Sequence, residues 1–163
     1  MERPIRLHLG SGRHPWPSNW IDIDLEGDPD INHDVTKLPM FEDGSVDEIQ
    51  AIHLFEHLPR LEVESVLKEW VRVLKIGGKI VLEMPSMDKI AQLIVNGEKN
   101  IRLTLLGIFG DLSNNPLMKH HWCWTNDEIE ELFKTCGLEV AFKEPVFHIS
   151  DRDFRIEATK CKD

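Results

Sequence analysis

The sequence lacks the features of a membrane or secreted protein. No apolar run approaches the roughly 20 residues of a membrane-spanning helix, and residues 1–4 do not open a secretory signal. The cysteines Cys123, Cys136 and Cys161 are an odd number without paired spacing, which is atypical of a disulfide framework. We therefore expect idle thiols in a reducing compartment, and a cytoplasmic location.

Positive charge is scarce as well. Lysine and arginine together number 19 against 29 acidic residues, which gives a formal net charge of −10. Proteins that bind nucleic acid usually present a basic face, so this balance argues against a nucleic-acid partner. Internal repeats, low-complexity tracts and linkers are also missing, and 163 residues are enough for one core. We expect a single domain over residues 1–163.

What the sequence does contain is an alternation of short strands and helices. Apolar residues recur at helical spacing over residues 63–74, and the Gly77-Gly78 pair is expected to end that helix. Thr125 and Glu128 form a capping box that opens a later helix. Strands are expected at residues 5–9, 20–24, 31–35, 46–53, 79–84, 138–143 and 154–160.

This alternation predicts an α/β three-layer sandwich. Its centre would be a Rossmann-like, mostly parallel seven-stranded sheet with helices on both faces. The last two strands are close enough for a hairpin, so one strand near the C-terminus is expected to be antiparallel. Insertions at strand carboxyl ends often build substrate pockets. We therefore place residues 85–124 on the substrate side, with one or two short helices over residues 87–110.

A glycine turn follows the first strand and carboxylates end the second. Leu9-Gly10-Ser11-Gly12 supplies the turn, and Asp22 and Asp24 supply the carboxylates. Glycines let a ligand approach the backbone without a Cβ clash, and an acid at the end of the next strand can accept both ribose hydroxyls. These residues predict a nucleoside site. The alternative is a plain turn beside polar residues at the solvent end of a strand.

Further motifs follow in a fixed order along residues 5–85. They are Asp34-Val35 ahead of Leu38-Pro39, Ser45-Val46-Asp47, Glu56-His57, and Leu74-Lys75-Ile76-Gly77-Gly78. Together they resemble the class I S-adenosylmethionine-dependent methyltransferases, and most closely the small proteins with D-x-x-x-L-P-F, D-x-S-x-D and L-K-P-G-G patterns. Ile76 stands where the pattern has proline, a mild change at a turn.

The resemblance implies S-adenosylmethionine as cofactor, with S-adenosylhomocysteine as product. Asp24 would take the ribose hydroxyls, Asp34 the adenine amino group, and the Val35 backbone N–H a ring nitrogen. His53 and Leu54 would border the sulfonium. For Asp34 the alternative is an Asx turn or a helix cap. The implied cofactor-binding residues are Leu9, Gly10, Ser11, Gly12, Asp22, Asp24, Asp34, Val35, His53 and Leu54.

The first crossover of the fold is short. Asp24 follows Gly10 more closely than the roughly 20 residues typical of a dinucleotide fingerprint. The stretch between the first two strands also contains Pro15 and Pro17, which cannot lie inside a helix. We therefore expect the family's first helix to be missing or reduced to a turn.

Four histidines are candidate catalytic bases, in the order His120, His121, His53 and His57. An acceptor oxygen or nitrogen that begins protonated would need such a base. The acceptor predicted is a small molecule or a sugar-type compound, because the Asp/Asn-Pro-Pro-aromatic motif of nucleic-acid amino-methylases is absent. For the adjacent pair His120-His121 the alternative is an interfacial loop. The sequence leaves monomer and homodimer open.

Two other functions remain as alternatives. The short first crossover would suit a non-catalytic module that binds S-adenosylmethionine or docks a partner. Residues 53–57 also match the H-x-x-E-H pattern of zinc hydrolases, which needs both histidines on one helical face. Pro59 follows closely and the preceding run is strand-like, so we expect no metal.

Overall fold

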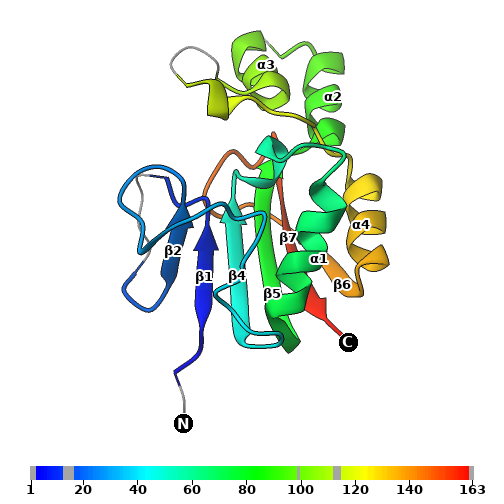
Figure 1. Ribbon diagram of the computed structural model, residues 1–163. Helices are drawn as coiled ribbons and strands as arrows, with labels where there is room; N and C mark the ends of the chain where they lie inside the picture. The colour runs from blue at the N-terminus through cyan, green and yellow to red at the C-terminus, as the bar shows by residue number, and fades with distance from the viewer. Residues whose placement is uncertain (1–2, 13–16, 99, 112–114, 162–163) are drawn as a thin grey trace.

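A single mixed sheet forms the centre of the protein (Figure 1). The computed structural model describes residues 3–12, 17–98, 100–111 and 115–161. The strand order is β3-β2-β1-β4-β5-β7-β6, with β7 antiparallel to both neighbours and the other pairs parallel. The strands are β1 (Arg6–Leu9), β2 (Ile21–Asp24), β3 (Ile31–Asn32), β4 (Val46–Ile52), β5 (Leu74–Pro85), β6 (Leu138–Lys143) and β7 (Asp153–Lys160). The predicted Rossmann-like sheet and its antiparallel strand are confirmed.

The helices fall into two groups (Figure 1). Helices α1 (Val63–Val73) and α4 (Asn126–Thr135) lie on one face of the sheet, whereas α2 (Met87–Val95) and α3 (Ile101–Phe109) lie above the carboxyl ends of β4 and β5. Two 3₁₀ turns, η1 (Phe55–His57) and η2 (Pro116–Met118), complete the described elements. None of the helices in the described ranges has the length and apolarity needed to cross a membrane.

Two local predictions about helix ends had different outcomes. The Thr125–Glu128 capping box is present at the start of α4. The predicted end of α1 at Gly77-Gly78 is wrong, because the helix ends at Val73 and both glycines lie in β5. The register against β4 shifts in this stretch, and Gly77 has a φ of 77°. The glycines therefore serve a bulge in the strand.

An aromatic cluster fills the space between the sheet and its helices. The ring of Phe55, in η1, lies 5.8 Å from Trp70, 5.7 Å from Trp124 and 5.9 Å from Phe133, measured between centroids. All four side chains are almost fully buried. The segment that follows β4 is therefore fixed by packing from α1, α4 and the segment before α4.

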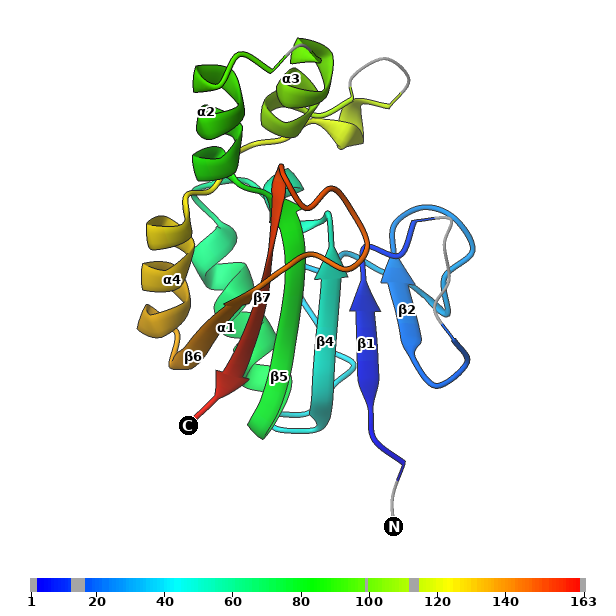
Figure 2. The ribbon, with the colours of Figure 1, turned by 180° about the vertical axis from the view of Figure 1, so that it is seen from behind.

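The opposite face of the sheet carries no helix in the described part of the chain (Figure 2). The predicted third layer is therefore not seen, although no description covers residues 13–16 of the first crossover. The strands explain this, because buried apolar side chains alternate with polar ones, as in Phe154-Arg155-Ile156-Glu157. Such alternation is typical of a sheet with one solvated face.

The β6–β7 connection, residues 144–152, crosses the upper part of that open face (Figure 2). It is anchored by Glu83, a β5 residue with no solvent exposure. The Glu83 carboxylate accepts the backbone N–H of Val146 at 2.8 Å and of Phe147 at 3.0 Å, and a guanidinium N–H of Arg155 at 2.8 Å. One buried carboxylate thus holds the connection against the sheet.

Candidate functional site

The predicted glycine turn lies directly after β1 and is tied to the end of β2. Gly10 has a φ of 70°, and its N–H donates to the carbonyl of Ile23 at 2.9 Å. Gly12 donates its N–H to Asp24 Oδ2 at 2.7 Å, and Asp24 Oδ1 accepts the N–H of Glu26 at 2.8 Å. Each carboxylate oxygen keeps a second lone pair. The turn and Asp24 thus fit a ribose, whose hydroxyls can use those lone pairs.

The two glycines differ in the space beside them. A Cβ on Gly10 would lie 2.8 Å from Leu54 Cδ1, whereas a Cβ on Gly12 would meet no atom of the described residues within 4 Å. Leu54, predicted from the sequence as a border of the site, therefore packs closely on Gly10. None of the described residues fills the space beside Gly12, which suits a ligand-binding turn.

This difference predicts unequal costs for two matched substitutions. Both glycines have left-handed φ values, 70° and 57°, so alanine at either position costs about 1–2 kcal/mol in backbone strain. Gly10→Ala should lower the free energy of unfolding by about 1–3 kcal/mol more than Gly12→Ala, because only its methyl group overlaps Leu54. Urea unfolding measures the difference, and Leu54→Ala in the Gly10→Ala background should remove it. Equal costs at the two positions would refute the close contact.

The other two predicted carboxylates have different surroundings. Asp22 is 4 % exposed, and its Oδ1 lies 2.9 Å from His8 Nδ1 of the neighbouring strand β1. Asp34 is exposed, and its Oδ1 accepts the Thr36 N–H at 2.9 Å, which is the Asx turn considered from the sequence. The two assignments to the cofactor stay predictions.

Val35 is held by a buried hydrogen bond. Its carbonyl accepts Trp70 Nε1–H at 2.8 Å. This hydrogen bond ties the loop after β3 to α1. It uses the Val35 carbonyl, so the Val35 N–H takes no part in it. The backbone that is predicted to meet the adenine ring is thereby fixed in place.

His53 follows β4 in an unusual conformation. Among the described residues it is the one non-glycine with a left-handed φ, at 52°. Its Nδ1 lies 2.8 Å from Glu56 Oε1, its Nε2 lies 3.3 Å from Asp153 Oδ2, and its ring stacks on His148 with centroids 4.0 Å apart. Such strained positions concentrate at functional sites.

The charges around His53 decide its protonation. Burial alone would lower the pKa of His53, but Glu56 and Asp153 raise that pKa to about 9. Burial would raise the pKa of Asp153, yet its bonds to His53 and Arg152 bring that pKa to about 2. His53 is therefore a cation at neutral pH and has no free lone pair with which to accept a proton.

A second group of side chains meets beside His53. Possible ligand atoms of Glu56, His57 and His120 all lie within 4.8 Å of one another. His57 and His120 stack edge to face with centroids 4.8 Å apart, and His120 Nε2 lies 4.0 Å from Glu56 Oε1. Only Phe55–His57 form a helical turn, so the H-x-x-E-H pattern does not form one helical face with His53.

The structure separates the adjacent histidines His120 and His121. The side chain of His120 is 7 % exposed and faces Glu56. The side chain of His121 is exposed, while its backbone N–H donates to the Glu56 carbonyl at 2.8 Å. Of the four candidate bases, His57 and His120 therefore share one cluster, and His53 adjoins it through Glu56.

Sequence reasoning missed two members of this region, Glu56 and Asp153. Glu56 stood in the H-x-x-E-H pattern, which was its available signal. Asp153 is far from His53 in the sequence, and nothing local pairs them. The arginine beside it, Arg152, binds both Asp153 oxygens at 2.6 and 2.9 Å.

The predicted insertion covers the edge of the sheet where these residues lie (Figure 1). Ser86 and Trp124 form a backbone bridge that closes its base. At its far side, Asn115 Nδ2 donates to Glu26 Oε2 at 3.1 Å, and Glu26 is the residue whose N–H binds Asp24. Residues 85–124 thus extend from the histidine cluster to the predicted ribose site.

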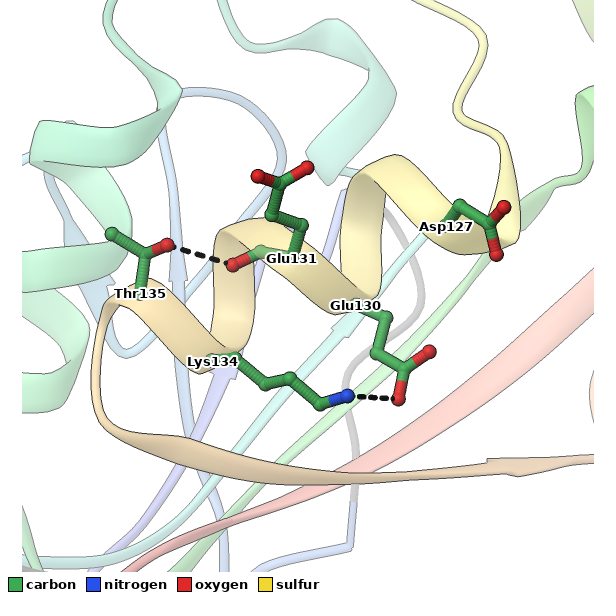
Figure 3. Close-up of a pocket in the computed structure, with 5 residues that line it drawn as sticks. All are labelled: Asp127, Glu130, Glu131, Lys134 and Thr135. Atoms are coloured by element: carbon green, nitrogen blue, oxygen red, sulfur yellow. Dashed lines mark hydrogen bonds and ion pairs between the residues drawn. The ribbon is translucent and has the colours of Figure 1, made fainter.

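A depression elsewhere on the molecule is not a candidate site. Figure 3 shows it on the outer side of α4, with a volume of about 490 Å³, lined by Asp127, Glu130, Glu131, Lys134 and Thr135. All of its lining residues come from one helix. Lys134 Nζ pairs with Glu130 at 2.6 Å, and Thr135 bonds to the Glu131 carbonyl at 2.9 Å. This is a solvated helix face, away from the carboxyl ends of β1 and β4.

Comparison with known proteins agrees with this geometry. Residues 18–82, from just before β2 to within β5, match the family model of a methyltransferase domain. This stretch of the chain is similar to a methyltransferase domain. The predicted class I S-adenosylmethionine-dependent methyltransferase family, the enzyme class and the cofactor are thereby confirmed. No curated protein matches the sequence.

Solved methyltransferase structures share the whole fold. An S-adenosylmethionine-dependent methyltransferase from Methanosarcina mazei is 17% identical with a TM-score of 0.68, over 100% of this chain and 95% of that one. One from Clostridium acetobutylicum is 13% identical with a TM-score of 0.67, over 97% and 84% of the two chains. The 1,6-didemethyltoxoflavin-N1-methyltransferase of Burkholderia thailandensis, with bound S-adenosylhomocysteine, is 15% identical with a TM-score of 0.67, over 98% and 72%.

Proposed function

We propose that this methyltransferase acts on an oxygen or nitrogen atom of a small-molecule or sugar-type acceptor. The observation that carries the proposal is the pair His57 and His120, which meets Glu56 at the carboxyl end of β4 beneath the insertion. In open α/β sheets, ligands bind outside the carboxyl ends of the strands. The net charge of −10 argues against a nucleic-acid acceptor, and the similar Burkholderia enzyme binds a small molecule.

The cofactor would be held along β1, β2 and β4. Asp24 would bind the ribose, the turn at residues 10–12 would line the methionine end, and Asp34 with the Val35 N–H would meet the adenine. Leu54 would border the sulfonium. When bound, S-adenosylmethionine supplies a methyl group activated by the positive charge on its sulfur. The protein then has to align the acceptor with that group and exclude water.

His120 is the group best placed to take a proton from the acceptor. Its Nδ1 lies 3.0 Å from the Gly107 carbonyl, which can only accept, so the proton belongs on Nδ1 and Nε2 keeps its lone pair. Burial lowers the pKa of His120, which favours the neutral base. His53, a cation, instead neutralises Glu56 and Asp153 as a positioning residue. We further propose that residues 1–163 act as one domain, with residues 85–124 as its acceptor side.

Calorimetry with S-adenosylhomocysteine tests the cofactor assignment. Asp24→Ala should weaken binding by about 1–3 kcal/mol, because a ligand hydroxyl loses a charged acceptor. The control is Asp28→Ala, an exposed carboxylate on the following loop, which should leave the affinity unchanged. Equal affinity for both variants would show that Asp24 does not bind the ribose.

Turnover separates the enzyme from a binding module. Production of S-adenosylhomocysteine is measured over a panel of hydroxyl and amine acceptors, with urea unfolding as a check that the protein is folded. Methylation of a member of the panel supports the proposal. Tight cofactor binding without turnover on the whole panel supports the non-catalytic alternative.

A further inference from the structure

We infer that Glu56, His57 and His120 form a binding site for a divalent transition-metal ion. Their possible ligand atoms lie within 4.8 Å of one another, and they come from η1 and from the segment that leads into α4. From the sequence we expected no metal at the H-x-x-E-H pattern, because a strand-like run before it and Pro59 after it disfavour the single helix that the pattern needs. The structure brings together a different set, in which His120 takes the place of His53.

Glu56 is the first observation that points to a ligand. Its residue is 1 % exposed, and neither carboxylate oxygen makes a hydrogen bond. His53 is close enough for an ion pair at 2.8 Å, but the contact lacks hydrogen-bond geometry. The His53 cation offsets the charge of Glu56, but it leaves both buried oxygens without a hydrogen bond, and a metal ion would satisfy them directly.

The two histidines are the second observation. His57 Nδ1 lies 3.0 Å from the Lys119 carbonyl, and His120 Nδ1 lies 3.0 Å from the Gly107 carbonyl. A carbonyl only accepts, so each Nδ1 carries its proton and each Nε2 keeps a lone pair. Metal-bound histidines almost always make this outer hydrogen bond to a carbonyl or carboxylate, because it fixes the ring and the tautomer.

The backbone around the cluster is already ordered. Phe55 anchors η1 in the aromatic cluster, and the His121 N–H donates to the Glu56 carbonyl at 2.8 Å. Gly110 and Lys119 form a backbone bridge just before His120. These backbone contacts hold the ligand atoms close together, so metal binding would need little rearrangement.

The donor set selects the kind of ion. Two imidazoles and one carboxylate suit Zn²⁺ and its transition-metal neighbours, whereas Mg²⁺ prefers oxygen ligands alone. Three protein ligands leave a coordination position open, as in catalytic zinc sites. With an ion bound, His120 Nε2 is a ligand and no longer accepts a proton, so its role as a general base applies to the metal-free protein. If the proposed function holds, the open position of the metal-bound protein receives an acceptor oxygen, and the ion lowers the pKa of that hydroxyl group. This role rests on the proposed function, but metal binding does not.

Zinc binding by the whole protein tests the site. Chelator-treated protein is titrated with ZnCl₂ by calorimetry, and the bound metal is counted after desalting. One ion per chain is expected. Loss of an outer hydrogen bond typically weakens metal sites by 10- to 100-fold, so Glu56→Gln and His120→Gln, which remove ligands, should weaken binding by about 100-fold or more. His121→Gln is the matched control, since its exposed side chain adjoins the cluster only in sequence, and it should bind as the unaltered protein does.

Further measurements identify the ligands, check the folding of the variants and separate the metal site from the proposed function. X-ray absorption of the zinc protein should show nitrogen and oxygen neighbours at roughly 2.0–2.2 Å and no sulfur, which excludes Cys123 as a ligand. Urea unfolding confirms that the variants fold, and Mg²⁺ should fail to bind. Less than one zinc per chain, or equal affinity in Glu56→Gln, overturns the site. S-adenosylhomocysteine binding, measured separately on the same samples, reports on the proposed function instead.

Discussion

Replacing Glu83 with alanine is expected to cost about 3–5 kcal/mol of the free energy of unfolding. The Glu83 side chain has no solvent exposure, and it accepts hydrogen bonds from Val146, Phe147 and Arg155. Removal leaves two backbone N–H groups and part of a guanidinium without an acceptor. Most of the cost comes from Arg155, whose side chain is 12 % exposed and would lose its buried partner.

Arg155 offers a matched control for this substitution. Its Nε also pairs with Glu157 at 3.1 Å, but the Glu157 side chain is 36 % exposed. Exposed ion pairs contribute little, so Glu157→Ala should cost about 1 kcal/mol or less. Urea unfolding compares the two variants, and hydrogen exchange at Val146 and Phe147 should accelerate in Glu83→Ala only. Equal stability losses would mean that Glu83 does not anchor the β6–β7 connection.

Loss of His120 is expected to lower kcat by about 10²- to 10⁴-fold, the range associated with a general base. His120→Gln removes the buried Nε2 that faces Glu56, while the cofactor residues on β1 and β2 are untouched. The Kd for S-adenosylhomocysteine should therefore stay the same. Single-turnover rates with the best acceptor of the panel measure the effect.

His121→Gln is the comparison for this variant, because its side chain is exposed and only its backbone contacts Glu56. Its kcat should change by less than about threefold, since surface substitutions usually act within ±0.5 kcal/mol. A larger loss in His121→Gln than in His120→Gln would reverse the assignment. Zinc content of both variants then separates loss of a proton acceptor from loss of a metal ligand.

Local sequence rules explain the parts of the fold that were predicted correctly. The Thr125–Glu128 capping box needs only residues within one turn, and short apolar runs, such as residues 80–82 of β5, reflect burial in a sheet. The end of α1 was misjudged because a Gly-Gly pair serves a strand bulge as well as a helix end. The neighbouring strand decided between these two uses.

The sequence of β7 contains a pattern that indicates the open face of the sheet, but the prediction of the fold did not use it. Arg155, Glu157 and Thr159 alternate with buried residues of β7, which is the period of a strand with one wet face. The expectation of two helical layers rested on the βαβ order instead. The described connections between β1 and β4 are short and contain no helix. That face of the sheet is therefore covered only by polar side chains and by the β6–β7 connection.

By itself the sequence determined the glycine turn with Asp24, the mixed sheet and the methyltransferase family, because these depend on residues close together along the chain. Only the tertiary structure decided which of the candidate histidines lie together and which carboxylates they contact. Packing of Phe55 brings Glu56 and His57 to His120, and the β6–β7 hairpin brings Asp153 to His53. Protonation and metal-binding capacity depend on charges within a few ångströms, and those neighbours come from segments that sequence spacing does not relate.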